Sequence, residues 1–324
     1  MAHRSKAVDR PKQPNAGDMM QPDDMAGLPA KIDSQIVARA ANAECTILIT
    51  GETGVGKGFL ARWIHEHSPR ARGPFIPVNC GAIPDSLIDS QLFGHVRGAF
   101  SGAVSDHVGL VRAAERGTLL LDEVSELPAS AQTRLLRLLQ EREVQPVGHS
   151  QPVKVDVRVV AATNCDLDAA VADGRFREDL LFRLDIIRLR VPPLRERIDD
   201  LPELLERFNL ELAELYRQRP LEFGDDAQQV LMNYPWPGNV RQLRTLVERL
   251  HVLCPGEQIT VGHLLEFGQL TPSPQIGAGR ELVERIKLEQ VRRVLANSGG
   301  SITRAAEVFG VHRSTIYRWL RGQS

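Results

Sequence analysis

The sequence predicts an α/β fold in which helices cover both faces of a parallel sheet, followed by an all-helical region and a small helical C-terminal segment. The first observation is that short apolar runs alternate with helical stretches between residues 45 and 191. Strands that are apolar throughout are typical of a parallel sheet buried on both faces. The second is a glycine loop ending in lysine, at residues 51–58, between the first apolar run and a helix. Together they predict a P-loop sheet whose ligand lies at the carboxyl ends of the strands.

The expected elements follow the chain in order. The candidate strands are residues 45–50, 75–79, 118–122, 157–163 and 186–191. A helix over 30–41 precedes the sheet, with Ile32, Ile36 and Val37 on its apolar face. The helix that follows the glycine loop covers 59–65. The all-helical region is expected to contain helices over 201–217, 225–233, 240–253 and 261–267.

Size and composition set broad limits. The chain has 324 residues, 42% hydrophobic and 25% charged, as in ordinary globular proteins. A net charge of −1 excludes a global basic field for nucleic acid but leaves a local one open. The four cysteines are too scattered for common zinc spacings and fit buried free thiols in a reducing cytoplasm. Without a membrane-length apolar run or a secretory signal, we expect a cytoplasmic protein that does not contact membranes.

The glycine loop has the residue types that binding a phosphate chain requires. Glycines let the backbone wrap around an anion with its N–H groups pointing inward, and the start of the next helix adds partial positive charge. Lys57 can reach the β- and γ-phosphates. A glycine-rich turn with a surface lysine is the alternative, which the flanking strand and helix disfavour. The nucleotide-binding residues expected here are Gly51, Glu52, Thr53, Gly54, Val55, Gly56, Lys57 and Gly58.

A second apolar run ends in two carboxylates, Asp122 and Glu123. Asp122 can hold Mg²⁺, directly or through water, and Glu123 can polarise a water that attacks the γ-phosphate. Gly58 stands where the usual loop has Ser or Thr as a magnesium ligand, so the metal must be held mainly elsewhere. Thr163 and Asn164 end another strand and would face the γ-phosphate if it lies beside the Asp122 strand; an Asn that caps a turn is the alternative. The presence of the glycine loop together with a strand that ends in two carboxylates favours hydrolysis of a nucleoside triphosphate.

The segment between these motifs, Leu92 to Ala103, resembles the Gly-Ala-Phe-Thr-Gly-Ala loop of bacterial enhancer-binding proteins, the AAA+ activators of sigma-54 RNA polymerase. The segments Phe176 to Leu184, Pro192 to Arg197 and Trp236 to Leu243 resemble the same family, as does the phosphate loop. The resemblance covers about residues 27–268, and the C-terminal segment extends it. It implies binding of ATP and Mg²⁺. It also implies this organisation: a flexible tail (1–25), an AAA+ α/β subdomain (26–194), a helical lid (195–268), a linker (269–279) and a Fis-type helix-turn-helix domain (280–324).

The resemblance also implies roles for single residues. Lys57, Asp122 and Glu123 match the nucleotide and catalytic positions. Asn79 matches an asparagine that holds the catalytic glutamate in check until the loop engages its target. The first sensor corresponds to Thr163 and Asn164, and the second sensor, in the lid, to Arg241.

Arg177 and Arg183 match the arginine fingers, which act on the nucleotide of a neighbouring subunit. A guanidinium is always charged and can fork onto phosphate oxygens, so it suits charge that develops during phosphoryl transfer. The resemblance therefore implies self-association into a ring, hexameric in this family. Without it, a solvated arginine-rich helix face would be the preferred interpretation.

Residues 98–103 are expected to touch sigma-54, with Phe100 and Ser101 at the loop tip. An exposed aromatic between glycines marks a contact site rather than core, although a Phe tucked under its own loop is the alternative. Ser101 replaces the usual Thr, and Arg112 stands where relatives commonly have an acidic residue, which bears on how hydrolysis is coupled to the loop. The expected contact residues are Gly98, Ala99, Phe100, Ser101, Gly102 and Ala103.

The C-terminal segment 280–324 has nine Lys or Arg against four Glu, the local basic patch expected of a DNA-binding module. Helices over 301–309 and 313–320 around a turn at 310–312 form a helix-turn-helix pattern that resembles the Fis-type domain. A basic bundle used only for dimerisation is the alternative. The residues expected to face DNA are Arg304, His312, Arg313, Ser314, Thr315, Tyr317 and Arg318.

The leading hypothesis is a sigma-54-dependent activator that binds enhancer DNA and uses ATP hydrolysis in a ring to convert the closed polymerase complex into the open one. Its expected partners are the sigma-54 RNA polymerase holoenzyme, enhancer DNA and further copies of itself. Since we expect no N-terminal receiver or sensory domain, control would come from a separate regulatory protein or from the amount of protein made. A DNA-binding regulator that works only in a mixed ring with a paralogue, or does not itself remodel, is the second hypothesis. A generic AAA+ unfoldase or loader is the third.

Overall fold

The computed structural model describes residues 28–29, 31–268, 291–292, 294–296, 299–309 and 312–321. The expected tail (1–25), the linker (269–279) and the start of the last domain lie outside these ranges. The predicted α/β class is confirmed, because five strands form one parallel sheet in the order β2-β3-β6-β1-β7. These strands are β1 (Ile47–Thr50), β2 (Phe75–Asn79), β3 (Thr118–Asp122), β6 (Arg158–Thr163) and β7 (Ile187–Arg190).

Alternate side chains of the strands enter two separate cores, which is why the strand sequences are apolar without a break. Leu119 and Leu121 of β3 face one core, whereas Leu120 faces the other. The Leu120 side is covered by α1 (Ser34–Asn42) and α2 (Lys57–Glu66). The opposite side is covered by α3 (Asp85–Phe93), α4 (Leu110–Ala113), α5 (Ala129–Glu141), α6 (Leu167–Ala172) and α7 (Glu178–Leu184).

The helix predicted over 30–41 begins later, at Ser34, because the Asp33 carboxylate caps it by accepting the N–H groups of Gln35 and Ile36. Its predicted apolar face was wrong in one respect. Ile36 is exposed, and Val37 is buried together with two small alanines of the same helix. Ala40 and Ala41 pack with Val37 in the core that α1 shares with α2 and the sheet, so two small residues occupy the buried face on which Ile36 was expected.

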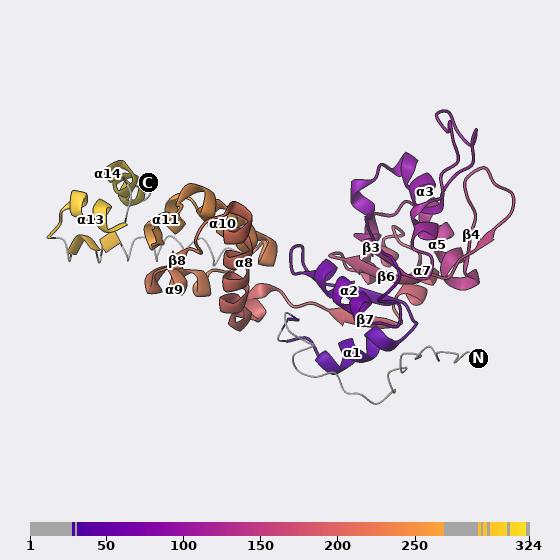
Figure 1. Cartoon of the computed structure of the whole chain (residues 1–324), viewed down its shortest axis with the longest axis horizontal. Coiled ribbons are helices and arrows are strands. Elements are labelled where there is room, and N and C mark those ends of the chain that lie inside the picture. Colours follow the sequence, from indigo (N-terminus) through magenta and orange to yellow (C-terminus); the bar gives the residue numbers. More distant parts are fainter. Residues whose placement is uncertain are drawn as a thin grey trace, which may run out of the picture.

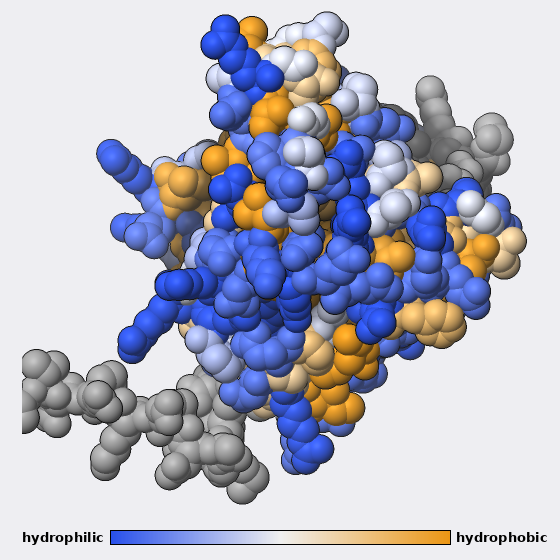
Figure 2. Space-filling model, turned by 90° about the vertical axis from the view of Figure 1, so that its right-hand side faces the viewer, coloured by the Kyte–Doolittle hydropathy of each residue, from blue (hydrophilic) through white to orange (hydrophobic). Residues whose placement is uncertain are grey.

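Two loops project side by side from the α/β part, next to α3 in Figure 1. One is the segment 94–109. The other joins β4 (Glu143–Val144) to β5 (Val153–Lys154). Val96 N–H donates to the Val147 carbonyl at 3.1 Å, and His95 and His107 exchange backbone hydrogen bonds at 3.0 and 2.8 Å. Figure 2 views this end of the molecule and shows hydrophobic residues among hydrophilic ones on the projecting region.

The predicted helical region lies between the α/β part and the C-terminal helices in Figure 1, but it is not all-helical. Two short strands within it, β8 (Glu222–Phe223) and β9 (Gln258–Ile259), pair in parallel. Each has only two residues, which is too short for an apolar pattern to indicate a strand. The core of this region also includes Val291, Ala306 and Ile316 from the C-terminal segment. In the described part of the chain, no helix is long and apolar enough to cross a membrane. The helices are α8 (Leu201–Tyr216), α9 (Asp225–Asn233), α10 (Asn239–Leu253), α11 (Val261–Glu266), α13 (Ile302–Phe309) and α14 (Arg313–Arg321).

Candidate functional site

The loop between β1 and α2 has the backbone conformation that an anion cradle needs. Gly54 and Gly56 have φ angles of 79° and 104°, a left-handed region that residues with a Cβ rarely adopt. Gly51 has no room for a side chain, since a Cβ would lie 2.5 Å from the Val191 carbonyl oxygen. The loop ends at Lys57, the first residue of α2, so the backbone N–H groups at the start of that helix point to the same place.

Lys57 is almost buried and its ammonium group donates to the carbonyl oxygens of Gly51 and Glu52 at 2.8 and 3.1 Å. Burial lowers the pKa of Lys57, while Asp122 and Glu123 act in the opposite direction. The Lys57 side chain therefore lies over its own loop, near the Asp122 and Glu123 carboxylates that were predicted to act together with it. A phosphate chain that enters the loop would replace the carbonyl oxygens as its partners.

The carboxylates lie at the carboxyl end of β3, where Asn79 of β2 is in register with Asp122. The Asp122 carboxylate accepts the Glu123 N–H at 3.0 Å. Glu123 has φ 55°, a left-handed conformation that costs a residue with a side chain roughly 1 kcal/mol or more. Its carboxylate lies over Gly81, where an added Cβ would be 2.7 Å from Glu123 Oε2 and 3.5 Å from Asn79 Oδ1. The structure thus places Asn79 beside Glu123, while the Asn79 oxygen caps a short turn by accepting the Ala82 N–H at 3.2 Å.

The strand β6 lies beside β3, so Thr163 and Asn164, at the end of β6, lie next to the carboxylates. This neighbouring position of the two strands was the condition for the role predicted for the pair. Their side chains differ in position. The Asn164 amide donates to the Thr53 hydroxyl of the phosphate loop at 2.9 Å. Thr163 is fully buried, and its hydroxyl donates to Ser125 at 3.2 Å. Only Asn164 of this pair faces the loop.

Gly58 opens onto a cavity of about 440 Å³ at the edge of the site, and a Cβ at this position would meet no atom within 4 Å. The position therefore has room for the hydroxyl-bearing residue that the sequence lacks. Among the described residues, no group of three or more His, Cys, Asp or Glu side chains could hold a metal ion. Mg²⁺ in nucleotide sites is bound by one or two carboxylates together with phosphate oxygens, and Asp122 fits that arrangement. The cavity is lined by Gly58, Phe59, Arg62, Phe75, Pro77, Val78, Asn79, Leu120 and Asp122.

The lid touches the phosphate loop directly. Arg241 N–H, near the start of α10, donates to the Gly54 carbonyl at 3.2 Å. A Cβ on Gly54 would overlap the Gly238 carbonyl oxygen and lie 3.1 Å from Arg241 Cβ. Arg241 is close enough to Lys57 for its charge to lower the pKa of that lysine. The structure therefore brings the predicted second sensor to the loop.

Arg177 and Arg183 are exposed at the two ends of α7. Arg177 forks onto Asp179 with distances of 3.0 and 2.7 Å. Within the described ranges, neither arginine forms a hydrogen bond or ion pair with the phosphate loop or with the two carboxylates. The structure does not bring these two residues to the site of their own subunit.

The projecting loop closes on itself through the Gly98 N–H, which donates to the Ala103 carbonyl at 2.8 Å. Gly98 and Gly102 both have positive φ with open space around them. Phe100 is 38% exposed and meets the His95 ring edge-on at a centroid distance of 5.0 Å. The Phe is therefore partly supported by the base of the loop and partly free for contact. Val104, the next large apolar residue, is 81% exposed.

At the C-terminus, α13 and α14 form the predicted pair of helices. The side chains of Ala305 and Ala306 are buried, and Ile316 of α14 enters the same core as the lid. His312 Nδ1 lies 2.8 Å from the Ser314 hydroxyl at the start of α14. The described side chains that the sequence assigned to DNA are exposed: Arg304, His312, Arg313, Ser314 and Tyr317. The side chains of Thr315 and Arg318, and residues 310–311 of the turn, lie outside the described part.

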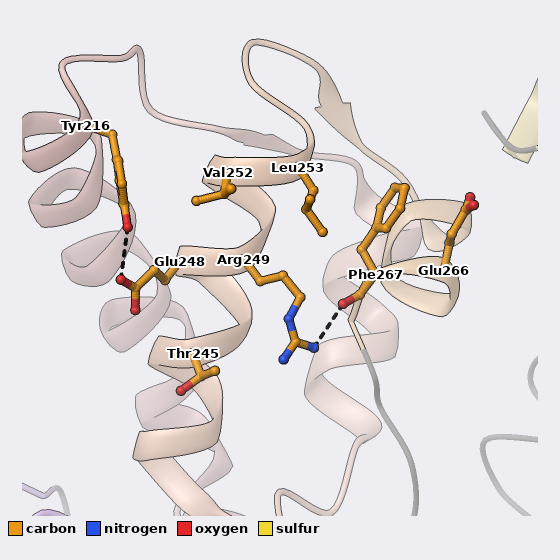
Figure 3. Close-up of a pocket in the computed structure, with 8 residues that line it drawn as sticks. All are labelled: Tyr216, Thr245, Glu248, Arg249, Val252, Leu253, Glu266 and Phe267. Atoms are coloured by element: carbon orange, nitrogen blue, oxygen red, sulfur yellow. Dashed lines mark hydrogen bonds between the residues drawn. The ribbon is translucent and has the colours of Figure 1, made fainter.

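A second cavity, of about 460 Å³, lies within the lid between α8, α10 and α11 (Figure 3). Tyr216 donates its hydroxyl to Glu248 at 3.0 Å, and Arg249 donates to the Phe267 carbonyl at 3.1 Å, across this space. None of its lining residues is one that the sequence assigned to the nucleotide, to sigma-54 or to DNA. The site is therefore the phosphate loop and not this cavity.

The phosphate loop also contacts three residues to which the sequence assigned no role: Asn239, Arg195 and Arg197. Asn239 is fully buried and donates to Glu52 Oε2 and to the Thr53 carbonyl, at 3.1 and 3.0 Å. Arg195 forks onto the Glu52 carboxylate, and Arg197 donates to the Val55 carbonyl at 2.6 Å. All three lie in segments that carried the resemblance, but nothing in sequence spacing places them against a loop that is more than a hundred residues away.

The four cysteines are free thiols, as expected, but only Cys80 and Cys254 are buried, whereas Cys45 and Cys165 are half-buried. Burial raises the pKa of the Cys80 thiol to about 12. Cys165 follows Asn164 directly, with its sulfur 3.5 Å from the Asn164 side-chain oxygen. The expectation of four buried thiols was therefore wrong for two of them, because Cys45 precedes the buried strand β1 and Cys165 follows the buried strand β6, so neither lies within a buried strand.

Three family models match the chain: a sigma-54 interaction domain over residues 29–190, an AAA+ ATPase lid domain over 195–273 and a homeodomain-like domain over 281–323. Response regulator protein PilR of Pseudomonas aeruginosa is 44% identical over 291 residues, which are 87% of this chain and 65% of PilR. The DNA-binding transcriptional regulator NtrC of a Bradyrhizobium species is 40% identical over 321 residues, with 89% and 66% covered. The chain thus spans just under two thirds of the length of these relatives.

Solved structures agree with this comparison. NtrX from Brucella abortus in complex with ADP aligns with a TM-score of 0.68 at 37% identity, over 89% of this chain and 66% of NtrX. The NtrX complex with ATP aligns with a TM-score of 0.65 at 37% identity, over 89% and 65%.

Proposed function

Because the chain belongs to the sigma-54 interaction domain family, with an AAA+ lid and a homeodomain-like domain, we propose that it is an ATPase that activates transcription by sigma-54 RNA polymerase. The observation that carries the ATPase part is the convergence on one loop of Lys57, Asn164 and the start of the lid. Strand ends that are far apart in sequence meet there, as an NTPase site needs. NtrX, which aligns over most of the chain, is a protein solved with ADP and with ATP.

In the proposed reaction each group has a distinct task. When bound, ATP would supply the phosphoryl group and Mg²⁺ would neutralise negative charge on its phosphate oxygens. Lys57 and the loop N–H groups hold the phosphates, and Asp122 would hold the metal. Glu123 orients the attacking water and accepts its proton, while Asn164 donates a hydrogen bond on the same side. The lid, which touches the loop through the Arg241 N–H, would shield this site from bulk solvent.

The arginines of α7 support a shared site. Arg177 and Arg183 are exposed and bond no group of their own nucleotide site, so they could complete the site of a neighbour in a ring, with Arg177 exchanging Asp179 for a phosphate. We infer the ring from this geometry and from the family, and a hexamer is the expected form. Exposed Phe182, 71% accessible between the two arginines, would be covered by the same contact.

The two ends of the molecule would meet the other partners. The loop with Phe100 at its tip would contact sigma-54, and α14, with Arg313 at its start, would enter the major groove of enhancer DNA. Together these contacts would direct hydrolysis to the closed promoter complex and convert it to the open one. A cytoplasmic location follows from this function.

Promoter melting tests the proposal most directly. Purified protein, sigma-54 holoenzyme and a sigma-54 promoter with its upstream region are incubated with ATP and Mg²⁺, and unpaired bases are probed chemically. Melting that requires ATP and is lost in Phe100→Ala, while Val252→Ala in the lid retains it, is the expected result; both side chains are exposed and apolar. ATP hydrolysis without melting would contradict an autonomous activator and favour one that needs a paralogous subunit.

A further inference from the structure

The carboxylate of Glu52 contacts the segment that joins the α/β part to the lid. Glu52 is the second residue of the loop, and Arg195 follows it by 143 residues. The two Arg195 NH groups lie 2.8 and 2.5 Å from the two Glu52 oxygens, a bidentate pair. The hydrogen bonds of Arg195 lower the pKa of the Glu52 carboxyl, and those of Glu52 raise the pKa of Arg195. A carboxylate held in this way is an ion-pair partner and not a ligand for an anion.

Asn239 ties three parts of the chain together at the same point. Its amide nitrogen donates to Glu52 Oε2 and to the Thr53 carbonyl, while its oxygen accepts the Leu194 N–H at 2.8 Å. Both donors and the acceptor of the side chain are therefore used, and the residue is fully buried. Asn239 also has φ 52°, an uncommon conformation that the surrounding contacts must hold in place.

A second cation strengthens the junction. Arg197 is 4% exposed and donates to the carbonyl oxygens of Val55 and Pro192 at 2.6 and 3.1 Å, and it pairs with Asp200 at 3.2 Å. The short segment between β7 and α8, which crosses from one part of the molecule to the other in Figure 1, is thus bonded to the phosphate loop at several points. A shift of the loop backbone would be passed to the lid through these bonds.

We propose that Glu52, Arg195 and Asn239 form a latch that holds the lid on the phosphate loop, and that Glu52 is a positioning residue rather than a nucleotide ligand. The latch sets where Arg241 stands relative to Lys57, because Arg241 lies two residues after Asn239 at the start of α10. It acts on ATP more than on ADP, since a cation carried by the lid gains most from the additional charge of the γ-phosphate. This inference rests on the proposed nucleotide site.

Nucleotide binding by the full chain tests the latch without sigma-54 or DNA. In Glu52→Ala we expect the Kd for a non-hydrolysable ATP analogue to rise about tenfold and that for ADP to rise less than about threefold. Arg195→Lys keeps the charge but not the fork, so a smaller loss is expected. Glu211→Gln is the matched control, because the Glu211–Arg244 pair, at 2.6 Å, is similarly exposed but lies within the lid.

Compensation separates positioning from a general structural defect. Asn239→Asp places a second carboxylate against Glu52 while keeping an acceptor for the Leu194 N–H, so ATP affinity should fall. In the double variant with Asn239→Asp and Glu52→Gln, the new amide at position 52 can donate to the new carboxylate at position 239, which reverses the original hydrogen bond. This double variant should recover about half of the ATP binding free energy that Asn239→Asp loses. Wild-type ATP affinity in Glu52→Ala, equal losses of ATP and ADP binding, or absence of compensation would each overturn the latch. Failure of the wild-type chain to bind ATP would instead overturn the proposed function.

Discussion

The side-chain amide of Asn164 donates to the Thr53 hydroxyl at 2.9 Å, although 111 residues separate the two. This bond links the end of β6 to the middle of the phosphate loop. In the nucleotide site proposed above, this amide would lie beside the γ-phosphate. The Asn164 side-chain amide therefore bonds to the phosphate loop, rather than capping a turn as in the alternative interpretation.

Asn164→Ala is expected to lower ATP turnover by roughly 10- to 100-fold, because a hydrogen-bond donor next to the transferred group stabilises the transition state more than the bound nucleotide. The Kd for ATP should change less than about threefold. Thr53→Val, which removes the partner hydroxyl but keeps its shape, should affect turnover much less. If both changes lower ATP turnover equally, turnover depends on the hydrogen bond between Asn164 and Thr53 rather than on a direct role of the Asn164 amide.

Glu123→Gln is expected to lower ATP turnover by roughly 100-fold or more, since the amide cannot accept the proton of the attacking water. ATP binding should be retained, because the amide keeps the size of the carboxylate. Steady-state phosphate release and equilibrium binding of a fluorescent nucleotide measure the two effects. The neighbouring exposed Glu126→Gln is the control, and unchanged turnover in Glu123→Gln would remove this residue from the mechanism.

Gly58→Ser should lower the Mg²⁺ concentration that gives half-maximal ATPase activity, because the position is open and lies on the cavity that Asp122 lines. The chain should also gain about 0.5 kcal/mol of stability, since Gly58 is the second residue of a helix. Gly58→Ala is the matched control: it stabilises α2 but adds no oxygen. If both variants change the Mg²⁺ dependence alike, the hydroxyl is not a ligand.

Acidification should destabilise the chain through two buried histidines. Burial lowers the pKa of His65 and His251 below the ordinary value of 6.5, so they stay neutral in the folded state. The unfolded chain binds protons there first, and the free energy of unfolding therefore falls as pH drops through 6.5 toward the lowered pKa and levels off below it. Urea unfolding between about pH 7.5 and 5.5 measures this slope. In the double variant with His65→Gln and His251→Gln, the free energy of unfolding should depend less on pH. If its dependence on pH is unchanged, other titrating groups cause it.

The α/β class, the five strands and the phosphate loop could be predicted from the sequence, because their signals are local. Glycine at positions of positive φ, an apolar strand and a following helix lie within about twenty residues of one another. The lid helices were predicted to within about a residue or two for the same reason, since each carries its own apolar period. The face of α1 was not, because the choice of buried residues depends on what lies opposite the helix.

Sequence by itself determined which chemistry is available at each position: a lysine and glycines at one loop, two carboxylates at one strand end, and a basic helical segment at the C-terminus. Tertiary structure alone decided that Glu52 contacts Arg195 and Asn239, and that Thr163 is buried while Asn164 reaches Thr53. The physical reason is that hydrogen bonds and ion pairs act over about 3 Å in space, whatever the separation along the chain. Only the folded sheet and lid bring residues 52, 195 and 239 within that distance.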